Sequence, residues 1–266
     1  MIPAVSAATF LKVLPSGRTR PCLMLCEDEV GTQFEIVVKL RAGIGSGASG
    51  TTGSICELLS SMLANDLGIR VPKPFIVDVD SDFHRAIPDP TLAEIFRKSQ
   101  GVNFGSQYLN EGYTTWPQER DIPPRVVQMA ADIFAFDLMI QNPDRRPDKP
   151  NLLRKGDDLV IYDHELAFSF LYMIGQTQYP WDNAGVGFLR DHLFFGKLKG
   201  RDDLSWTRLQ DALEVLDDRR LMRYAETVPV GWRQESLYPT EQIVGYIAQV
   251  RDQSKRLFQK VREVLV

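Results

Sequence analysis

Two aspartates and one asparagine near the middle of the chain are the residues best suited to chemistry. Asp144 and Asn151 lie in the polar segment NPDRRPDKPN (142–151), and Asp163 ends the apolar run LVIYD (159–163). Mg²⁺ accepts carboxylate and amide oxygens and leaves positions for phosphate oxygens, while a further carboxylate can orient or deprotonate an attacking hydroxyl. The alternative is an exposed turn in which Asp and Asn only bend the chain. The three residues together favour phosphoryl transfer.

A lysine and a glutamate in the first quarter of the chain could serve the same chemistry. Lys39 ends the apolar run FEIVVK (34–39), so its ammonium could lie in a cleft against phosphate. Glu57 follows on a predicted helix, outside its leucine stripe and beside small residues, from where it could reach Lys39 and hold it. The alternatives are a lysine whose ammonium reaches water while its stem packs, and an exposed helical glutamate.

Two glycine-containing segments could contact phosphates, and neither is specific. The first is a donor-rich turn of the kind that many hairpins have, formed by Ser16, Gly17, Arg18 and Thr19. The second, GSGASG (45–50), matches the dinucleotide-binding pattern G-x-G-x-x-G. Against that reading, the preceding strand ends in charged residues, three more residues separate the pattern from the helix, and no acid closes a second strand about 20 residues later. Residues 41–53, which include five glycines, are predicted to form a mobile loop.

The first half of the chain alternates short apolar runs with turns, which predicts a sheet. Strands are expected at 8–14, 22–28, 34–40, 74–79 and 103–109. Helices are expected at 54–68, where apolar residues share one face and Gly68 ends the pattern, and at 91–100. Residues 110–124 contain three prolines and are the predicted link to a second part.

After residue 124 the pattern becomes mainly helical. A strongly apolar helix is expected at 125–141, followed by the polar loop and a hairpin that turns at 155–157. Further helices are expected at 205–216 and, as one continuous element, at 240–264. Strands first and helices later predict an α+β fold with segregated elements.

Composition excludes several classes of protein. The 266 residues carry a net charge of −4, which gives no basic field for nucleic acid, and contain no apolar run long enough to span a membrane. The N-terminus has no signal-peptide layout. The cysteines make neither a disulfide framework nor a zinc site: Cys22, Cys26 and Cys56. The histidines are too few for a multi-histidine metal centre: His84, His164 and His192. These features predict a cytoplasmic protein with no membrane or direct nucleic-acid partner.

The segments described so far resemble the HipA-like kinase family, which is distantly similar to phosphatidylinositol kinases. The resemblance extends over about residues 10–170 and includes SGRTRP, FEIVVKL, CELLSSMLANDLGIRVPKP, FGSQYL, FDLMIQNPDRRPDKPN and VIYDHELAF. The specific part is the order N-x-D-R, then N, then D-H. The resemblance implies a two-lobed protein-kinase-like fold, with an N-terminal antiparallel sheet lobe that carries a helix and a mainly helical C-terminal lobe. The implied boundaries are 1–112 and 113–266.

The resemblance also implies a role for each candidate residue. Lys39 would bind the α- and β-phosphates of ATP in the cleft between the lobes, steadied by Glu57. The turn 16–19 would cover the phosphates, and the adenine hinge would comprise Gln107, Tyr108 and Leu109, extending to Asn110. Asp144 would be the catalytic carboxylate, and Arg145 would pair with it or with the γ-phosphate. Mg²⁺ would be held by Asn151 and Asp163.

The chain departs from the larger HipA-type toxins in two ways. Seven positions separate Asp144 from Asn151, which is more than those toxins have, and the additional residues include proline and lysine. The chain is also expected to lack their additional N-terminal subdomain, so contacts with a DNA-binding antitoxin are not assumed.

The resulting prediction is a bacterial, cytoplasmic kinase that uses ATP and Mg²⁺. Its acceptor would be a serine or threonine hydroxyl on a protein of unknown identity. Three alternatives stay open: a small-molecule kinase, a non-catalytic pseudokinase that binds nucleotide, and an enzyme that transfers AMP. Autophosphorylation in the glycine-rich loop would favour a protein kinase, and the available hydroxyls are those of Ser46, Ser49, Thr51 and Thr52.

Overall fold

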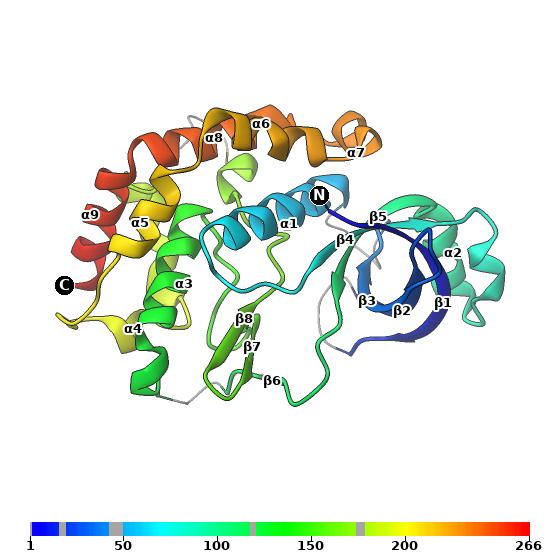
Figure 1. Ribbon diagram of the computed structural model, residues 1–266, viewed down its shortest axis with the longest axis horizontal. Coiled ribbons are helices and arrows are strands. Elements are labelled where there is room, and N and C mark those ends of the chain that lie inside the picture. Colours follow the sequence, from blue (N-terminus) through cyan, green and yellow to red (C-terminus); the bar gives the residue numbers. More distant parts are fainter. Residues whose placement is uncertain (1, 16–19, 43–49, 118–120, 174–178) are drawn as a thin grey trace. The chain divides into compact units, whose positions relative to one another are not determined.

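The computed structural model describes residues 2–15, 20–42, 50–117, 121–173 and 179–266 (Figure 1). The chain forms two compact units, each assembled from separate segments. The first unit comprises Met1–Leu58, Pro72–Asn110 and Thr227–Leu237. The second comprises Leu59–Val71, Glu111–Glu226 and Tyr238–Val266. The structure therefore has the mixed α/β content and the N-terminal sheet that the sequence predicts.

The first unit is built on five strands that close into a barrel in the order β1-β2-β3-β5-β4. The strands are β1 (Ala4–Val13), β2 (Cys22–Glu27), β3 (Gln33–Lys39), β4 (Pro74–Val79) and β5 (Gly101–Gln107). The pairing is antiparallel except between β1 and β4, which run parallel. The expectation of a purely antiparallel sheet is therefore corrected at the parallel pair of β1 and β4. This pair closes the barrel, so that none of its five strands has an unpaired edge.

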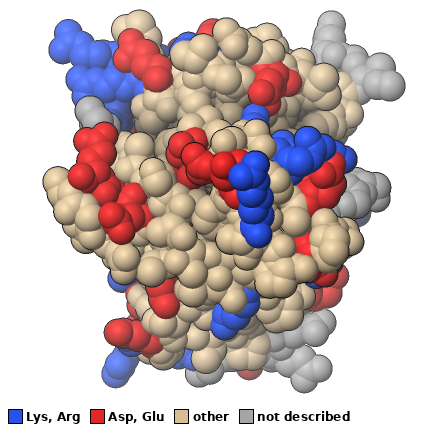
Figure 2. Space-filling model, turned by 90° about the vertical axis from the view of Figure 1, so that its right-hand side faces the viewer, with Lys and Arg blue, Asp and Glu red and all other residues tan. Residues whose placement is uncertain are grey.

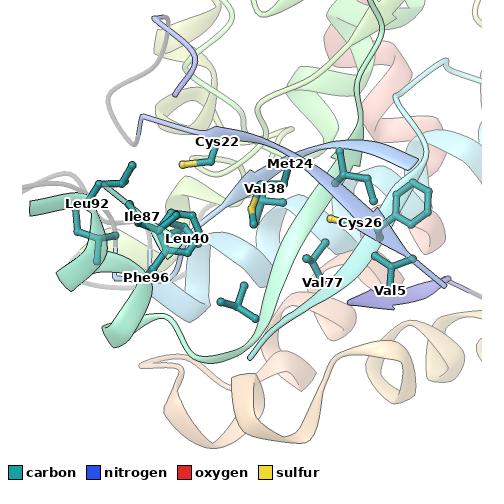
Figure 3. Close-up of a cluster of buried hydrophobic side chains, with 14 residues drawn as sticks. Val5, Cys22, Met24, Cys26, Val38, Leu40, Val77, Ile87, Leu92 and Phe96 are labelled. Carbon is teal, nitrogen blue, oxygen red and sulfur yellow. The ribbon is translucent and has the colours of Figure 1, made fainter. Parts of the chain in front are cut away.

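The interior of the barrel and the helix beside it form one apolar cluster (Figure 3). Alternate residues of the strands point into it, as the period of two in a strand requires: Val5, Met24, Cys26, Val38 and Val77 are among them. Ile87, Leu92 and Phe96 extend the cluster to α2 (Pro90–Lys98) and the preceding segment. Helix α2 begins where the Asp89 carboxylate accepts the Leu92 N–H at 2.7 Å, an ordinary N-terminal cap.

Helix α1 (Gly50–Asp66) begins earlier than the sequence pattern predicts. Residues 50–53 belong to its first turn, so the expectation that the glycine-rich loop continues to residue 53 is wrong at this end. Thr51 and Thr52 are buried there, and the Thr52 hydroxyl lies 3.0 Å from that of Ser236. Packing of these threonines offsets the poor helix propensity of the two flanking glycines. Residues 43–49 lie outside the described part of the chain.

The remaining elements include a small sheet, ordered β6-β7-β8, and several helices. The strands are β6 (Thr114–Thr115), β7 (Leu152–Lys155) and β8 (Asp158–Ile161). The α-helices are α3 (Val127–Met139), α4 (Phe195–Leu198), α5 (Thr207–Glu214), α6 (Asp218–Thr227), α7 (Val230–Glu235), α8 (Thr240–Asp252) and α9 (Ser254–Leu265). Short 3-10 helices lie at Phe83–Ala86, Pro124–Val126, Ser169–Tyr172 and Asn183–Asp191.

Helix α3 is the centre of the second unit. Almost all its residues are buried, including two aspartates, and it contacts α4 and α9. A helix that is apolar on all sides must lie inside a core. Its C-terminal end is fixed further by the Tyr246 hydroxyl of α8, which donates to the Met139 carbonyl at 2.9 Å. The polar loop that follows α3 thus begins from a rigid support.

The C-terminal segment forms two helices, so the expectation of one continuous helix at 240–264 is wrong. Gln253 departs from helical geometry, with φ −109° and ψ 25°, between α8 and α9. Beside the break, the buried Ser254 hydroxyl donates to Glu214 of α5 at 2.6 Å, and Arg251 donates to the Leu216 carbonyl at 2.9 Å. These tertiary contacts favour a bend that the uninterrupted apolar periodicity does not reveal.

Charges of both signs are mixed on the face that Figure 2 shows. Figure 2 shows one face, on which acidic and basic side chains lie beside one another among uncharged residues. Within the described residues, no helix is long and apolar enough to cross a membrane.

Candidate active site

Lys39 and Glu57 are brought together in the first unit. The Lys39 ammonium donates to the Glu57 carboxylate, and both side chains are largely buried. Lys39 is the last residue of β3, and Glu57 lies on α1. A buried carboxylate that receives a charge-assisted hydrogen bond fixes the position of the ammonium. The pair therefore presents an oriented positive charge of the kind that a phosphate group requires.

The predicted adenine-binding segment follows β5, and two of its backbone donors are already used. The Gln107 N–H donates to the Lys73 carbonyl, and the Tyr108 N–H to the Glu35 carbonyl, each at 2.9 Å. Tyr108 and Leu109 are half-buried, whereas Gln107 is exposed. The structure thus places this segment on the barrel. The predicted phosphate-covering turn, Ser16, Gly17, Arg18 and Thr19, lies outside the described residues.

The loop after α3 is organised by hydrogen bonds to Asp137, which lies in the last turns of that helix. The Asn142 amide donates to Asp137 Oδ1 at 2.9 Å, and the Asn142 side-chain oxygen accepts the Asp144 N–H at 3.2 Å. Asp137 and Asn142 are buried completely. Asn142 therefore links the helix to the backbone of Asp144, the predicted catalytic residue.

Arg145 is paired differently from the sequence-based expectation. Its side chain is 0% exposed, and its Nε donates to Asp137 Oδ2 at 2.5 Å. Its other nitrogens bond to the Asn151 carbonyl and approach His164 Nε2 at 3.1 Å. Pairing with Asp144 is thus corrected to pairing with Asp137, since a buried guanidinium requires a buried carboxylate. Arg145 acts on the geometry of the loop.

A histidine completes this buried network. His192 Nε2 lies 3.0 Å from Asp137 Oδ2, while His192 Nδ1 accepts the Phe194 N–H at 3.1 Å. Burial by itself would raise the pKa of Asp137, but the Arg145 cation and the His192 hydrogen bond outweigh it and hold that pKa well below its usual range. Burial lowers the pKa of His192, although its hydrogen bond to Asp137 opposes the shift. The network is therefore an ion pair with a neutral imidazole.

Asp144 and Asn151 come together although seven positions separate them. The Asn151 amide donates to the Asp144 carbonyl at 3.1 Å and to Asp144 Oδ2 at 3.2 Å. Both residues are buried. Asn151 has φ +43° and Asp163 has φ +61°, a left-handed backbone that Asn and Asp tolerate better than most residues. Non-glycine residues in this conformation are frequently found at functional sites.

Lys149 connects the predicted catalytic and metal-binding carboxylates. Its ammonium donates to Asp144 Oδ2 and lies 3.1 Å from Asp163 Oδ2. Burial would lower the pKa of Lys149, but the charge of Asp163 and the hydrogen bond to Asp144 prevail and raise it. The structure therefore gathers Asp144 and Asp163 around one lysine, and Asn151 is hydrogen-bonded to Asp144.

The donor set in this region suits a hard divalent cation. Asp163 and Glu165 have carboxylate oxygens within 4.8 Å of each other, and Asn151 adds an amide. Oxygen donors with more than one carboxylate fit Mg²⁺ and leave positions for phosphate oxygens. Asn151 and Asp163, the residues expected to hold Mg²⁺, are thus of the appropriate chemical type, and Glu165 is an additional candidate.

Sequence reasoning missed three residues of this site: Asp137, Glu165 and His192. Asp137 had a visible signal, because an aspartate within the apolar run IFAFDLM (133–139) requires a buried partner. Glu165 lies two positions after Asp163, a spacing that could have drawn attention to it. His192 gave no signal, since 55 positions separate it from its partner Asp137.

Comparisons with known proteins point to one family. The model of the HipA-like kinase family matches residues 8–260. Among solved structures, the chain is similar to the Helicobacter pylori proinflammatory kinase CtkA, with 12% sequence identity, 98% of each chain covered and a TM-score of 0.45. It is also similar to the Leishmania major MAP kinase LmaMPK10, with 11% identity, coverage of 96% of this chain and 81% of that chain, and a TM-score of 0.29. A search of curated proteins finds no match.

The family match extends well beyond the segments on which the sequence-based resemblance rests. It includes the barrel, the loop after α3 and the C-terminal helices. The predicted family is therefore confirmed: the chain belongs to the HipA-like kinase family and is a kinase-like phosphotransferase.

Proposed function

We propose that this protein transfers the γ-phosphate of ATP, in the presence of Mg²⁺, to a serine or threonine hydroxyl of a protein substrate. The observation that carries the proposal is the loop after α3. There, Asp144 and Asp163 lie around one cation, and Asn151 is hydrogen-bonded to Asp144. A buried ion pair supports the loop. Family membership supports phosphoryl transfer, and the choice of a protein hydroxyl rests on the family resemblance.

In this mechanism, the Asp144 carboxylate orients the acceptor hydroxyl and receives its proton. Asn142 and Asn151 hold Asp144 through its backbone and side chain. The buried ion pair of Arg145 with Asp137 fixes the position of the loop, so little reorganisation is needed during the reaction. Such preorganisation is a major source of catalysis in phosphoryl transfer.

Asn151, Asp163 and Glu165 are the residues proposed to hold Mg²⁺. When bound, the ion neutralises charge on the phosphates. Asn151 is held rigidly, since its carbonyl accepts a hydrogen bond from Arg145 and its amide donates to Asp144. The amide and the carboxylates would supply oxygen ligands of the kind that Mg²⁺ takes in proteins.

The residues proposed to bind the nucleotide lie in the first unit. Lys39, oriented by Glu57, would contact the α- and β-phosphates. The segment 107–109 would bind adenine, and Leu109 would supply the backbone donor, since the Gln107 and Tyr108 N–H groups are used within the barrel. The turn 16–19 keeps its proposed role over the phosphates. Dependence on ATP and three buried cysteines that form no disulfide favour a cytoplasmic location.

The proposal is tested by incubating the purified protein with Mg²⁺ and γ-labelled ATP. Phosphate release and intact mass are both measured, with casein and myelin basic protein as trial acceptors. Asp144→Asn is compared with Asp148→Asn, which removes an exposed carboxylate from the same loop. We expect label transfer in the wild type and in Asp148→Asn, and a loss of about 10³-fold in Asp144→Asn, equivalent to roughly 4 kcal/mol.

Other outcomes would change the proposal. Equal rates in the two variants would remove Asp144 from its role. An added mass of one nucleotide would favour AMP transfer, and ATP binding with no turnover on any acceptor would favour a pseudokinase. Transfer to sugars or aminoglycosides but not to proteins would favour a small-molecule kinase.

A further inference from the structure

Lys149 occupies an unusual place for a loop lysine. Its ammonium contacts both Asp144 and Asp163, the carboxylates proposed for proton acceptance and for metal binding. An ammonium carries three donors and one positive charge. The ammonium therefore gives these two carboxylates a shared positive charge at short range, which is part of what a metal ion would provide.

The backbone around Lys149 fixes this arrangement. The Arg146 N–H donates to the Lys149 carbonyl at 3.0 Å, and the Lys149 N–H donates to the Arg146 carbonyl at 3.1 Å. These two hydrogen bonds close a small loop that contains Pro147, and Pro150 follows Lys149. The proline rings restrict φ at positions 147 and 150. The ammonium is thus held near the carboxylates by a rigid turn.

The side chain nevertheless has a route away from the carboxylates. It is 29% exposed, whereas Asp144 and Asp163 are only 8% and 11% exposed. A long, flexible lysine stem can turn its ammonium into water while the turn stays closed. Asp144 has no comparable freedom, because Asn142 and Asn151 hold it.

We propose that Lys149 is a resident cation of the metal site, which holds Asp144 and Asp163 together and must be displaced from Asp163 by the incoming divalent ion. Lys149 thereby sets the metal affinity of the nucleotide-free protein. This inference rests on the proposed assignment of Asp163 to the metal. Its consequence is that free metal binds weakly, because the competent state, with Asp163 released, is a minor one.

The test measures binding of Mn²⁺ alone, in the absence of nucleotide, by electron paramagnetic resonance. Lys149→Met removes the ammonium, and Lys149→Arg keeps a cation with several donors. Arg146→Met is the matched control, since it removes one positive charge from the same turn, and its partner is the exposed Asp148. We expect Mn²⁺ to bind about tenfold more tightly to Lys149→Met, and with little change to the other two.

Adding Asp163→Asn to Lys149→Met should abolish the gain. Equal affinities in the wild type and Lys149→Met would overturn the inference and leave the metal assignment intact. An equal gain in Arg146→Met would also overturn it, since general charge would then explain the effect. Absence of saturable Mn²⁺ binding in every variant, with and without ATP, would overturn the metal assignment and the inference together. Circular dichroism establishes that each variant is folded.

Discussion

At the scale of single residues, the largest electrostatic cost is concentrated at Asp137. Its carboxylate and the Arg145 guanidinium are both 0% exposed, and each is stable there because of the other. Removing one partner of a buried pair leaves an uncompensated charge, which costs several kcal/mol. The position of the loop after α3 therefore depends on a fully buried ion pair.

Asp137→Asn is expected to destabilise the protein by about 3–5 kcal/mol, since it leaves Arg145 buried and unpaired. Urea denaturation, followed by circular dichroism, measures the free energy of unfolding. Asp132→Asn on the same helix is the control, since its partner Arg208 is 56% exposed and keeps its contact with water when the carboxylate is removed, so that a smaller loss is expected. Similar losses in the two variants would show that burial of the pair is unimportant.

Glu57→Gln is expected to weaken ATP binding by about tenfold. The substitution keeps the shape of the side chain and removes the charge that orients Lys39, and charge-assisted hydrogen bonds contribute roughly 1.5–3 kcal/mol. Calorimetry with ATP measures the effect. Glu94→Gln, an exposed glutamate of the same unit paired with Arg97, should bind ATP as the wild type does. Unchanged affinity in Glu57→Gln would argue against a phosphate-binding role for the pair.

At the scale of elements, the close packing of the barrel strands depends on the absence of a side chain at Gly105. A Cβ added at Gly105 of β5 would lie 2.6 Å from methyl groups of both Ile36 and Val77. Those side chains belong to the neighbouring strands β3 and β4. Close packing around Gly105 therefore allows the strands to enclose the apolar cluster.

Gly105→Ala is expected to destabilise the protein by about 1–3 kcal/mol through overpacking. Gly245→Ala, in the exposed part of α8, is the opposite case, because no atom lies within 4 Å of the added Cβ. That substitution should stabilise the helix by about 0.5–1 kcal/mol. Thermal unfolding measures the stability of both variants. An unchanged stability of Gly105→Ala would mean that the strands can separate slightly without a cost in free energy.

At the scale of the whole molecule, the buried network makes stability depend on pH. The pKa values of Asp137 and His192 are both lowered in the folded state. The unfolded chain therefore binds more protons than the native state as pH falls, so stability declines toward acid. For His192 the decline begins near its ordinary pKa of 6.5.

His192→Gln should remove the part of this dependence that lies between pH 7 and pH 5. We expect the wild type to lose more stability than the variant over that interval, since the imidazole of His192 takes up a proton more readily in the unfolded chain. Urea denaturation at several pH values measures the difference. Parallel curves for the two proteins would show that His192 does not change its protonation on unfolding.

Much of the local structure could be predicted because it follows from local pattern. The runs 74–79 and 22–28 form β4 and β2 nearly as expected, and the apolar stretch 125–141 contains α3. The errors occur where distant contacts override the pattern. Helix α1 extends into a glycine-rich segment. The C-terminal helix breaks at Gln253, where its neighbours Ser254 and Arg251 bond to Glu214 and to the Leu216 carbonyl.

The sequence by itself determined which chemical groups are present and their order along the chain. The residues Lys39, Glu57, Asp144, Asn151 and Asp163 could be selected from residue type and spacing, and their catalytic and binding roles stay predictions. Family membership was likewise predictable, because the order of these residues is specific.

The pair of Lys39 with Glu57 was also predictable, but only the tertiary structure decided how the groups around the loop after α3 are paired. It joined Arg145 to Asp137 instead of Asp144, added His192 from 55 positions away, and placed Lys149 between two carboxylates. The physical reason is that hydrogen bonds and ion pairs act over a few ångströms in space. Which groups come within that range depends on how the whole chain packs, and periodicity along the sequence carries no such information.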